Sequence, residues 1–355
     1  MEQISRILYK KKYFKGYLKS RLKKINDSVS EERYKDFGIL NPSIASTNLG
    51  DRIIYDSVWT VLRQVFPYDM FTDYPTQLHT AFDAKTMMSE KELLFISGTN
   101  LLSSNLETRH QWKINNSHKR FLKNKVVLFG TGWWQYQGGI NKYTEKIYNS
   151  VLNKNVVHSV RDSYTEQKLH DIGIMNVANT TCPTLWQLTP EKCATIPRKR
   201  ANAVITTLTF YHQNKVEDYR MLELLEENYE KVYLWLQSTN DHHYYNELNK
   251  GFKKIEFVPP TVEAYNSILD NADIDYIGTR LHAGVRALQK GLRTLILAVD
   301  NRAFEIGRDV NLNVVKRENV DRAIDFINNE YRTEIKLPTQ NINKFLKTLN
   351  NYANY

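Results

Sequence analysis

Arg280 and His282 stand two residues apart, where a buried strand is expected to give way to a helix. The apolar run at 274–277 is typical of a strand inside a sheet, and Thr279 is expected to cap a helix that ends at Gly291. The free amides of a helix start favour an anion, and an arginine fork binds carboxylate or phosphate through two hydrogen bonds. His282 could move a proton near neutral pH. The segment therefore predicts a site for a small anion with acid–base chemistry beside it.

A second arginine, Arg161, repeats this arrangement earlier in the chain. The run at 156–160 predicts a strand that ends at Arg161, and Ser163 with the glutamate three residues later has the spacing of a capping box. Ligands gather at the carboxyl edge of open parallel sheets, so two such sheets facing each other would aim Arg161 and Arg280 at one cleft. The alternative for Arg161 is a plain salt bridge with Asp162 or a neighbouring acid, and both interpretations stay open.

A third junction of this kind precedes a helix expected from Ile53 onward. Asn48 and Gly50 suit a tight turn where the backbone approaches a ligand. Asp51 at the start of the helix is explained by helix electrostatics. The sharper alternative is a base that deprotonates a sugar hydroxyl.

Other patterns point to chemistry less directly. Four aromatic residues cluster in the first half of the chain: Trp112, Trp133, Trp134 and Tyr136. They could stack on sugar rings, although most buried aromatic residues simply belong to a core. The glycines at 130–132 begin like a dinucleotide fingerprint, but Gln135 stands where the third glycine belongs, which excludes a nicotinamide site. His242 and His243 are adjacent, so their side chains diverge, and a surface loop is expected there.

The elements that must position these residues form an α/β fold, because strand-like and helical runs alternate as in parallel sheets. The first domain is expected at residues 34–187 and the second at 203–335. A polar, proline-punctuated linker at 188–202 joins them. A basic leader at 1–33 precedes the domains, and a tail at 336–355 with one more helical patch follows them.

Composition fits a soluble globular protein of two domains, with 355 residues, 41% of them hydrophobic and 25% charged. The longest apolar runs have the length of strands, and the N-terminus lacks the apolar core of a signal peptide, so a cytoplasmic protein is expected. Cys182 and Cys193 are the only cysteines and have no paired histidines. Neither a disulfide framework nor a metal site is expected.

The positive charge is concentrated at the N-terminus. Residues 1–24 hold nine basic side chains and one acidic one, a net +8 of the chain's +10, and apolar residues recur among them at helical spacing. Such a helix could bind an anionic membrane through residues 1–25, at the inner membrane face, and a solvated leader helix explains it equally well. No motif that reads nucleic acid accompanies the charge, so no nucleic-acid partner is expected.

With these residues in view, the sequence resembles the polysaccharide pyruvyl transferase family from about Ser43 to Arg317. Three pieces carry the resemblance: Asn48, Gly50 and Asp51; Val160, Arg161 and Asp162 with Leu169 and Gly173; and Arg280, Leu281 and His282 with Ala287, Gly291 and Asp300. The chain departs from the family pattern at 97–100, which replaces a more glycine-rich loop. It departs again at Cys182, where an acidic residue often precedes the proline.

The resemblance implies two Rossmann-like domains facing a cleft, similar to the two-domain (GT-B-like) glycosyltransferases. It implies phosphoenolpyruvate as the donor and a galactose-type hexose in a cell-surface polysaccharide, or in its lipid-linked precursor, as the acceptor. The products would be a cyclic pyruvate ketal and phosphate, with no cofactor.

The residues found above fit this chemistry in named roles. Arg161 and Arg280 would hold the donor, His282 would transfer a proton, and Asp51 would act as the base for an acceptor hydroxyl. Further substrate contacts are expected from Leu281, Thr279, Asn48, Gly50 and His110.

Two other functions remain alternatives. A glycosyltransferase of the same architecture that uses a nucleotide sugar would need a pair of acids near the nucleotide, yet Glu305 has Asn313 eight places on. A carbohydrate-binding or assembly protein that keeps the fold without catalysis is the other alternative.

Overall fold

The computed structural model describes residues 35–355, apart from 109–110, 249–250, 272 and 354–355. The leader expected at 1–33 and the candidate contact His110 lie outside the described residues. Within the described part of the chain, no helix has the length and apolar character needed to cross a membrane.

The first half of the chain builds a parallel sheet in the order β2-β1-β3-β4. Its strands are β1 (Asp36–Asn41), β2 (Met70–Pro75), β3 (Leu94–Ser97) and β4 (Val126–Phe129). A short parallel pair, β5 (His158–Val160) and β6 (Val177–Asn179), is linked to the segment after β4 by a bridge between Thr131 and Val160. The helices of this half are α2 (Leu49–Val65), α3 (Phe82–Glu90), α4 (Lys142–Val151) and α5 (Ser163–His170), with short turns η1 (Asn116–His118) and η2 (Pro183–Leu185).

The second half builds a six-stranded parallel sheet in the order β12-β11-β10-β7-β8-β9. The strands are β7 (Ala203–Thr206), β8 (Lys231–Trp235), β9 (Ile255–Val258), β10 (Ile274–Gly278), β11 (Thr294–Ala298) and β12 (Val314–Lys316). The strands are connected by η3 (Phe210–His212) and the helices α7 (Lys215–Asn228), α8 (Thr239–Leu248), α9 (Val262–Leu269), α10 (Leu281–Gln289) and α11 (Asn301–Val310), and η4 (Arg317–Arg322) and α12 (Ala323–Asn328) follow the last strand. This is the doubly wound order, in which the chain reverses direction across the sheet between β7 and β10.

Alternation along the strands explains why helices cover both faces of this sheet. In β11, Ile296 packs in one apolar cluster with α9, α10 and α11, while Leu295 and Leu297 pack in another with α7 and α12. Successive side chains of a strand point to opposite faces, and a parallel sheet is buried on both. The strand therefore reads as a continuous apolar run.

Helix α2 joins the two halves. Its residues Ile53 and Val58 belong to the same buried cluster as Ala283 and Ala287 of α10. Because α2 begins at the carboxyl edge of the first sheet and α10 at that of the second, this packing brings the two helix starts together. The carboxyl ends of both sheets are thereby held near one another.

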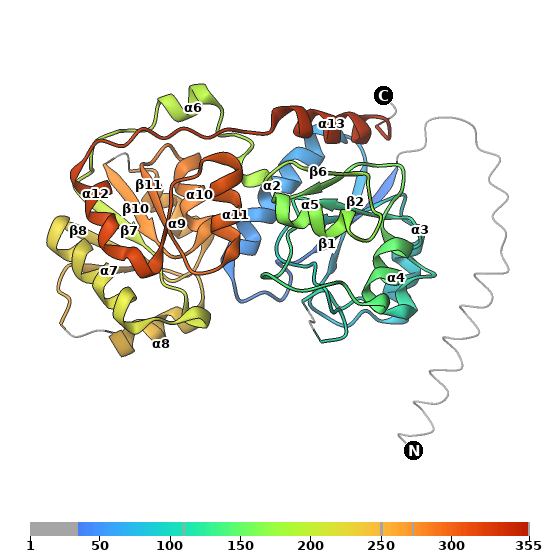
Figure 1. The fold of residues 1–355 in the computed structure, drawn as a ribbon, viewed down its shortest axis with the longest axis horizontal. Coiled ribbons are helices and arrows are strands. Elements are labelled where there is room, and N and C mark those ends of the chain that lie inside the picture. The colour runs from blue at the N-terminus through green and yellow to red at the C-terminus, as the bar shows by residue number, and fades with distance from the viewer. Residues whose placement is uncertain (1–34, 109–110, 249–250, 272, 354–355) are drawn as a thin grey trace, which may run out of the picture. The chain divides into compact units, whose positions relative to one another are not determined.

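The C-terminal helix α13 (Thr339–Asn350) returns to the first half of the chain, where Figure 1 shows it in red beside α2 and β6. Its Phe345 is fully buried, with its ring centroid 4.8 Å from that of Phe129. Residues 188–202, expected as a linker, contain the short helix α6 (Pro190–Ala194). The expected domain boundaries stay a prediction.

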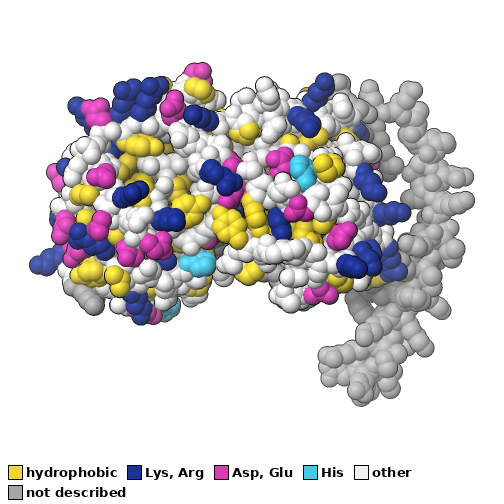
Figure 2. All heavy atoms as spheres, in the orientation of Figure 1, with side chains coloured by type: hydrophobic (Ala, Val, Ile, Leu, Met, Phe, Trp, Pro, Cys, Tyr) yellow, Lys and Arg dark blue, Asp and Glu magenta, His cyan; other side chains and the backbone are white. Residues whose placement is uncertain are grey.

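Figure 2 shows one face of the molecule, where side chains of both charges are interspersed with isolated apolar ones. His242 and His243 lie on α8 and not in a surface loop. That expectation was wrong because the buried Tyr244, Tyr245 and Leu248 give the segment a helical apolar face. The described residues contain no group of His, Cys, Asp and Glu placed to hold a metal ion.

Candidate functional site

A cavity of about 450 Å³ lies where the strands of both sheets end. Its walls come from the segments after β1, β2, β3 and β4 in the first half and after β7 and β11 in the second. The lining residues are Ala45 to Asn48, Asp51, Gln77, Thr99, Asn100, Gln111, Trp134, Gln135, Tyr211, His212 and Asp300 to Arg302. This is the position at which open α/β sheets bind ligands.

A narrower recess adjoins the cavity and shares Asn48, Tyr211, Asp300 and Arg302 with it. Its volume of about 20 Å³ has room for one water-sized molecule. The remaining walls are Gln237, Thr279 to His282, Val299 and Ala303. The first residues of α10 and of α11 therefore both line the recess.

Three loops of the cavity are held in a strained backbone conformation. Ala45, Thr99 and Gln135 have φ values of 59°, 57° and 54°, in the left-handed region that side chains other than glycine avoid. Each costs about 1 kcal/mol or more and persists because surrounding contacts fix it. Strain at three walls of one cavity is typical of a functional site.

Arg280 is the N-cap of α10 and is buried in the recess. Its Nη2 donates to both carboxylate oxygens of Asp241, at 2.7 and 2.9 Å, and its Nε donates to the Leu208 carbonyl at 2.8 Å. Within the described residues its Nη1 is buried without an acceptor. An orphaned donor of this kind is costly unless a ligand supplies the acceptor.

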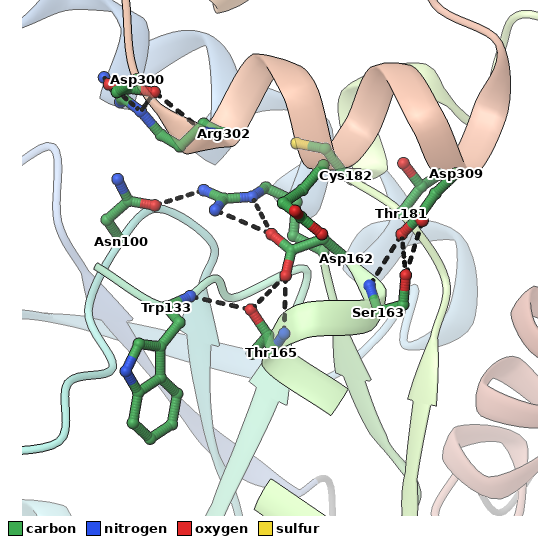
Figure 3. Close-up of polar contacts among 12 residues, drawn as sticks. Asn100, Trp133, Asp162, Ser163, Thr165, Thr181, Cys182, Asp300, Arg302 and Asp309 are labelled. Carbon is green, nitrogen blue, oxygen red and sulfur yellow. Dashed lines mark hydrogen bonds and ion pairs between the residues drawn. The ribbon is translucent and has the colours of Figure 1, made fainter. Parts of the chain in front are cut away.

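Arg161 follows β5 and is fully buried. Its Nε and Nη2 donate to the Asp162 carboxylate at 3.0 and 2.9 Å, and Nη1 donates to Asn100 Oδ1 (Figure 3). Gly132 makes room for it, because a Cβ there would lie 2.2 Å from the Arg161 Cζ. The salt bridge left open above is therefore present, and Arg161 lies behind Asn100, which lines the cavity.

His282 lies in the first turn of α10 and is buried, with its Nε2 3.6 Å from Cys182 Sγ. Burial, together with the nearby Arg302 and Arg161 charges, lowers its pKa to about 3, against a smaller opposing effect of Asp300. With this pKa the imidazole is neutral at pH 7. The pKa lies below the neutral range expected from the sequence.

Asp51 is buried at the start of α2, and its carboxylate accepts from Ser46 Oγ at 2.7 Å and Thr99 Oγ1 at 3.0 Å. Burial raises its pKa, against the opposing effect of these hydrogen bonds and of Arg302 and Arg280. A carboxylate with a raised pKa holds a proton more readily than an exposed one, as a base in a site must.

Asn48 and Gly50 connect the two halves of the site. Asn48 caps α2, and its Oδ1 accepts from Gly50 N at 3.2 Å and from Gln237 Nε2 at 2.5 Å. A Cβ on Gly50 would lie 2.8 Å from Gln237 Nε2. The turn therefore approaches a side chain from the end of β8.

Arg302 is a third arginine at this site and is partly buried, with 15% of its side chain exposed. It donates through Nε to both oxygens of Asp300, at 3.0 and 2.9 Å, and through Nη2 to the Tyr211 hydroxyl at 3.0 Å. Although burial alone would raise the pKa of Asp300, Arg302 lowers it to about 2, and the pKa of Arg302 is raised in turn. Figure 3 shows this pair at the start of α11, above Asn100 in the view, and all three residues line the cavity.

A sequence model of the polysaccharide pyruvyl transferase family matches residues 48–301, from the cap of α2 to the start of α11. The chain belongs to this family. Comparison with curated protein sequences found no match.

Two solved structures are similar to this pyruvyl transferase family member in fold. The UDP-GlcNAc 2-epimerase of Methanocaldococcus jannaschii has a TM-score of 0.50 and 8% identity, over 89% of this chain and 99% of that one. The UDP-N-acetylglucosamine 2-epimerase of Rickettsia bellii has a TM-score of 0.51 and 11% identity, over 90% and 95%. Identities this low show the fold alone. The expected α/β fold with two Rossmann-like, GT-B-like halves is confirmed.

In this family member the recess brings Arg280, Leu281, His282 and Thr279 together. Thr279 is not the helix cap, because Arg280 holds that position and the Thr279 hydroxyl bonds to Thr209 Oγ1 and the Thr207 carbonyl. Similarly, Asp162 and not Ser163 caps α5. In both cases the cap is displaced by one residue from the position that spacing predicts.

The aromatic residues divide between core and site. Trp112 and Trp133 are buried in the core with Tyr148. Trp134 lines the cavity, and the exposed Tyr136 donates its hydroxyl hydrogen to Glu305 Oε1 at 2.5 Å.

Arg302 was not singled out from the sequence, and Asp300 entered only as part of the family resemblance. The signal was available, because they follow the apolar run of β11 just as Arg280 follows that of β10. The partner of Arg280 had no such signal, since Asp241 is 39 residues away.

Proposed function

We propose that this protein is a pyruvyltransferase that moves the pyruvyl group of phosphoenolpyruvate onto two hydroxyls of a galactose-type hexose. The hexose would belong to a cell-surface polysaccharide or its lipid-linked precursor. The observation that carries the proposal is the buried Nη1 of Arg280, which has no partner among the described residues and lies in a recess beside neutral His282 and the starts of two helices.

The donor fits the charge of the recess. Phosphoenolpyruvate carries a phosphate and a carboxylate close together, and Arg280, Arg302 and the start of α10 supply cationic and amide donors for both. The recess has room for only one water-sized molecule, so Arg302 or Tyr211, which line it, must move when the donor enters. Arg161 would then act through its charge, behind Asn100.

The acceptor fits the wider cavity. Its wall from the first half carries the amides of Gln77, Asn100, Gln111 and Gln135 beside Trp134. Amides donate to and accept from hydroxyl groups, and an aromatic face packs on the apolar side of a sugar ring. Asp51 is the carboxylate of this wall. These groups suit a neutral hexose better than a charged one.

The reaction forms two carbon–oxygen bonds at one carbon, the first by addition and the second by displacement of phosphate. One acceptor hydroxyl adds to the central carbon of phosphoenolpyruvate, and a proton is delivered to the methylene carbon, which becomes a methyl group. A second hydroxyl of the same ring then bonds to that carbon while the bond to phosphate breaks. The two hydroxyl protons are thus accounted for by the methyl group and the released phosphate.

Within this scheme, Asp51 would take a proton from an acceptor hydroxyl, since burial raises its pKa. His282 would pass a proton to the methylene carbon or the phosphate. The arrival of an anionic donor would raise the lowered pKa of His282 and let it carry that proton.

The test is phosphate release from phosphoenolpyruvate, measured with a galactose-type acceptor, without acceptor, and with nucleotide sugars in place of the donor. We expect release only with donor and acceptor together, and an acceptor that gains the mass of one pyruvate less one water. Release of a nucleoside diphosphate would instead identify a glycosyltransferase. Acceptor binding with no turnover of any donor would identify a carbohydrate-binding protein.

A further inference from the structure

Cys182 contacts His282 from the other half of the chain. It follows β6 through Thr181, whose φ is 58°, and only 1% of its surface is exposed. Its Sγ lies 3.6 Å from His282 Nε2, within hydrogen-bond distance for sulfur. One side of the imidazole is therefore covered by a thiol.

Thr184 limits what this thiol can do. Its hydroxyl donates to Cys182 Sγ at 3.1 Å, and its backbone forms a second hydrogen bond to the sulfur. Burial raises the pKa of the Cys182 thiol, so the sulfur keeps its hydrogen. With the sulfur already accepting from Thr184, the S–H group is left to donate, and His282 Nε2 is the acceptor in reach.

We propose that Cys182 is a positioning residue that holds His282 in the tautomer with its proton on Nδ1. The nitrogen that accepts a hydrogen bond cannot carry the proton of a neutral imidazole, so the hydrogen bond at one nitrogen fixes the other. His282 also lines the recess. An Nδ1–H group would thus be available to a bound anion, a role that rests on the proposed function.

The charges around His282 favour this neutral, directed state. Arg302 from α11 and Arg161 after β5 oppose a positive charge on the ring, and Asp300 at the cap of α11 supports one. Cys182 adds no charge on its side. A carboxylate in its place would accept from Nε2–H and would move the proton to Nε2.

The tautomer can be measured in the full-length protein without donor or turnover, by 15N NMR of the histidine rings with His282→Gln to assign the signal. We expect Nδ1 of His282 to be protonated and Nε2 to be bare at pH 7. Cys182→Asp should protonate Nε2. Cys193→Ala is the matched control, since Cys193 is also buried but contacts the Leu188 carbonyl, and it should leave the tautomer unchanged. Protonated Nε2 in the unaltered protein would overturn the proposal.

A second arm measures turnover. Cys182→Ala should lower kcat about tenfold while the donor KM changes little, because it loosens a proton-transfer group and not the arginines. Cys193→Ala should keep the original kcat, and both variants should show similar unfolding midpoints. Unchanged kcat in Cys182→Ala would overturn the role in catalysis. Absence of phosphate release by the unaltered protein would instead defeat the proposed function and leave the tautomer result standing.

Discussion

At the scale of single residues, the three arginines of the site each have a carboxylate partner, yet they are not equivalent. Arg161 is paired with its neighbour Asp162 and shielded by Asn100, and Arg302 is paired with Asp300. Arg280 is paired with Asp241 and still keeps one buried donor free of any partner in the described chain. Removing one member of a buried ion pair lowers the free energy of unfolding by about 3 to 5 kcal/mol. The hydrogen bonds of the Arg280 guanidinium must therefore be tested with a substitution that keeps the positive charge.

We expect Arg280→Lys to raise the donor KM about tenfold or more. Lysine keeps a cation beside Asp241 but cannot hold a second acceptor in a planar fork, and a charge-assisted hydrogen bond contributes about 1.5 to 3 kcal/mol. Initial rates against phosphoenolpyruvate concentration measure the effect. Arg293→Lys is the matched control, because Arg293 is equally buried and paired with Asp275 outside the cavity. An unchanged donor KM in Arg280→Lys would show that Nη1 does not bind the donor.

The lowered pKa of His282 makes a prediction about stability. The folded protein resists protonation of this ring down to about pH 3, whereas the unfolded chain takes up a proton near pH 6.5. The unfolded state therefore binds more protons between these values, and the free energy of unfolding falls as the pH drops from 6.5 towards 3. Between pH 7 and pH 5 this histidine should account for a loss of about 2 kcal/mol.

His282→Gln removes that contribution, so its free energy of unfolding should depend less on pH than that of the original protein. Urea unfolding at pH 7 and pH 5 measures the difference. Equal pH dependence of the two proteins would mean that the ring is protonated in the fold or exposed to water.

At the scale of elements, the sequence locates strand-to-helix junctions but not their partners. An apolar run followed by a polar cluster identified the starts of α2, α5 and α10. Thr279 was expected to cap α10 because threonine is a common N-cap residue. Its hydroxyl instead donates to the carbonyl of Thr207, just after β7, which is the neighbour of β10 in the sheet. Asp241 and Cys182 lie far along the chain from Arg280 and His282, and spacing says nothing about such contacts.

Helix α11 contributes to the candidate site at its first residues and to contacts between the two halves of the chain near its last residues. Its start supplies Arg302 to both cavities, while Asp309 near its end accepts from the first backbone amide of α5 at 2.7 Å and from Asn179 Nδ2 at 2.7 Å. A carboxylate at a helix start is favoured by the helix dipole. The second half of the chain is thereby tied to the segment that carries Arg161.

We expect Asp309→Asn to lower the free energy of unfolding by about 1 to 2 kcal/mol, since it removes a charge at the start of α5 and replaces one acceptor oxygen with a donor. Urea unfolding measures this change. Glu330→Gln is the control, because Glu330 is exposed and lies 3.8 Å from Lys199, and it should change stability by less than about 0.5 kcal/mol. If Asp309→Asn is as stable as the control, Asp309 does not hold α11 to α5.

At the scale of the whole molecule, alternation of strand and helix was enough to predict parallel sheets, since both faces of such a sheet must be covered. It could not predict that α13 packs back onto the first half, because a helix of mixed composition does not say which surface it covers. Nor could it predict the three strained loops, whose conformations are fixed by contacts between distant segments.

The uneven charge of the chain carries the last prediction. Residues 1–24 hold a net +8 of the total +10, so the rest of the chain is close to neutral. Each basic side chain near an anionic bilayer contributes about 1 kcal/mol, and salt screens that attraction within about 10 Å at 0.1 M. We expect the full-length protein to sediment with vesicles containing anionic lipid, and less so as salt is raised. Deleting residues 1–25 should abolish sedimentation and leave phosphate release with a soluble acceptor unchanged. If the deleted protein still sediments, the membrane contact lies elsewhere; if neither protein sediments, the leader is a solvated segment.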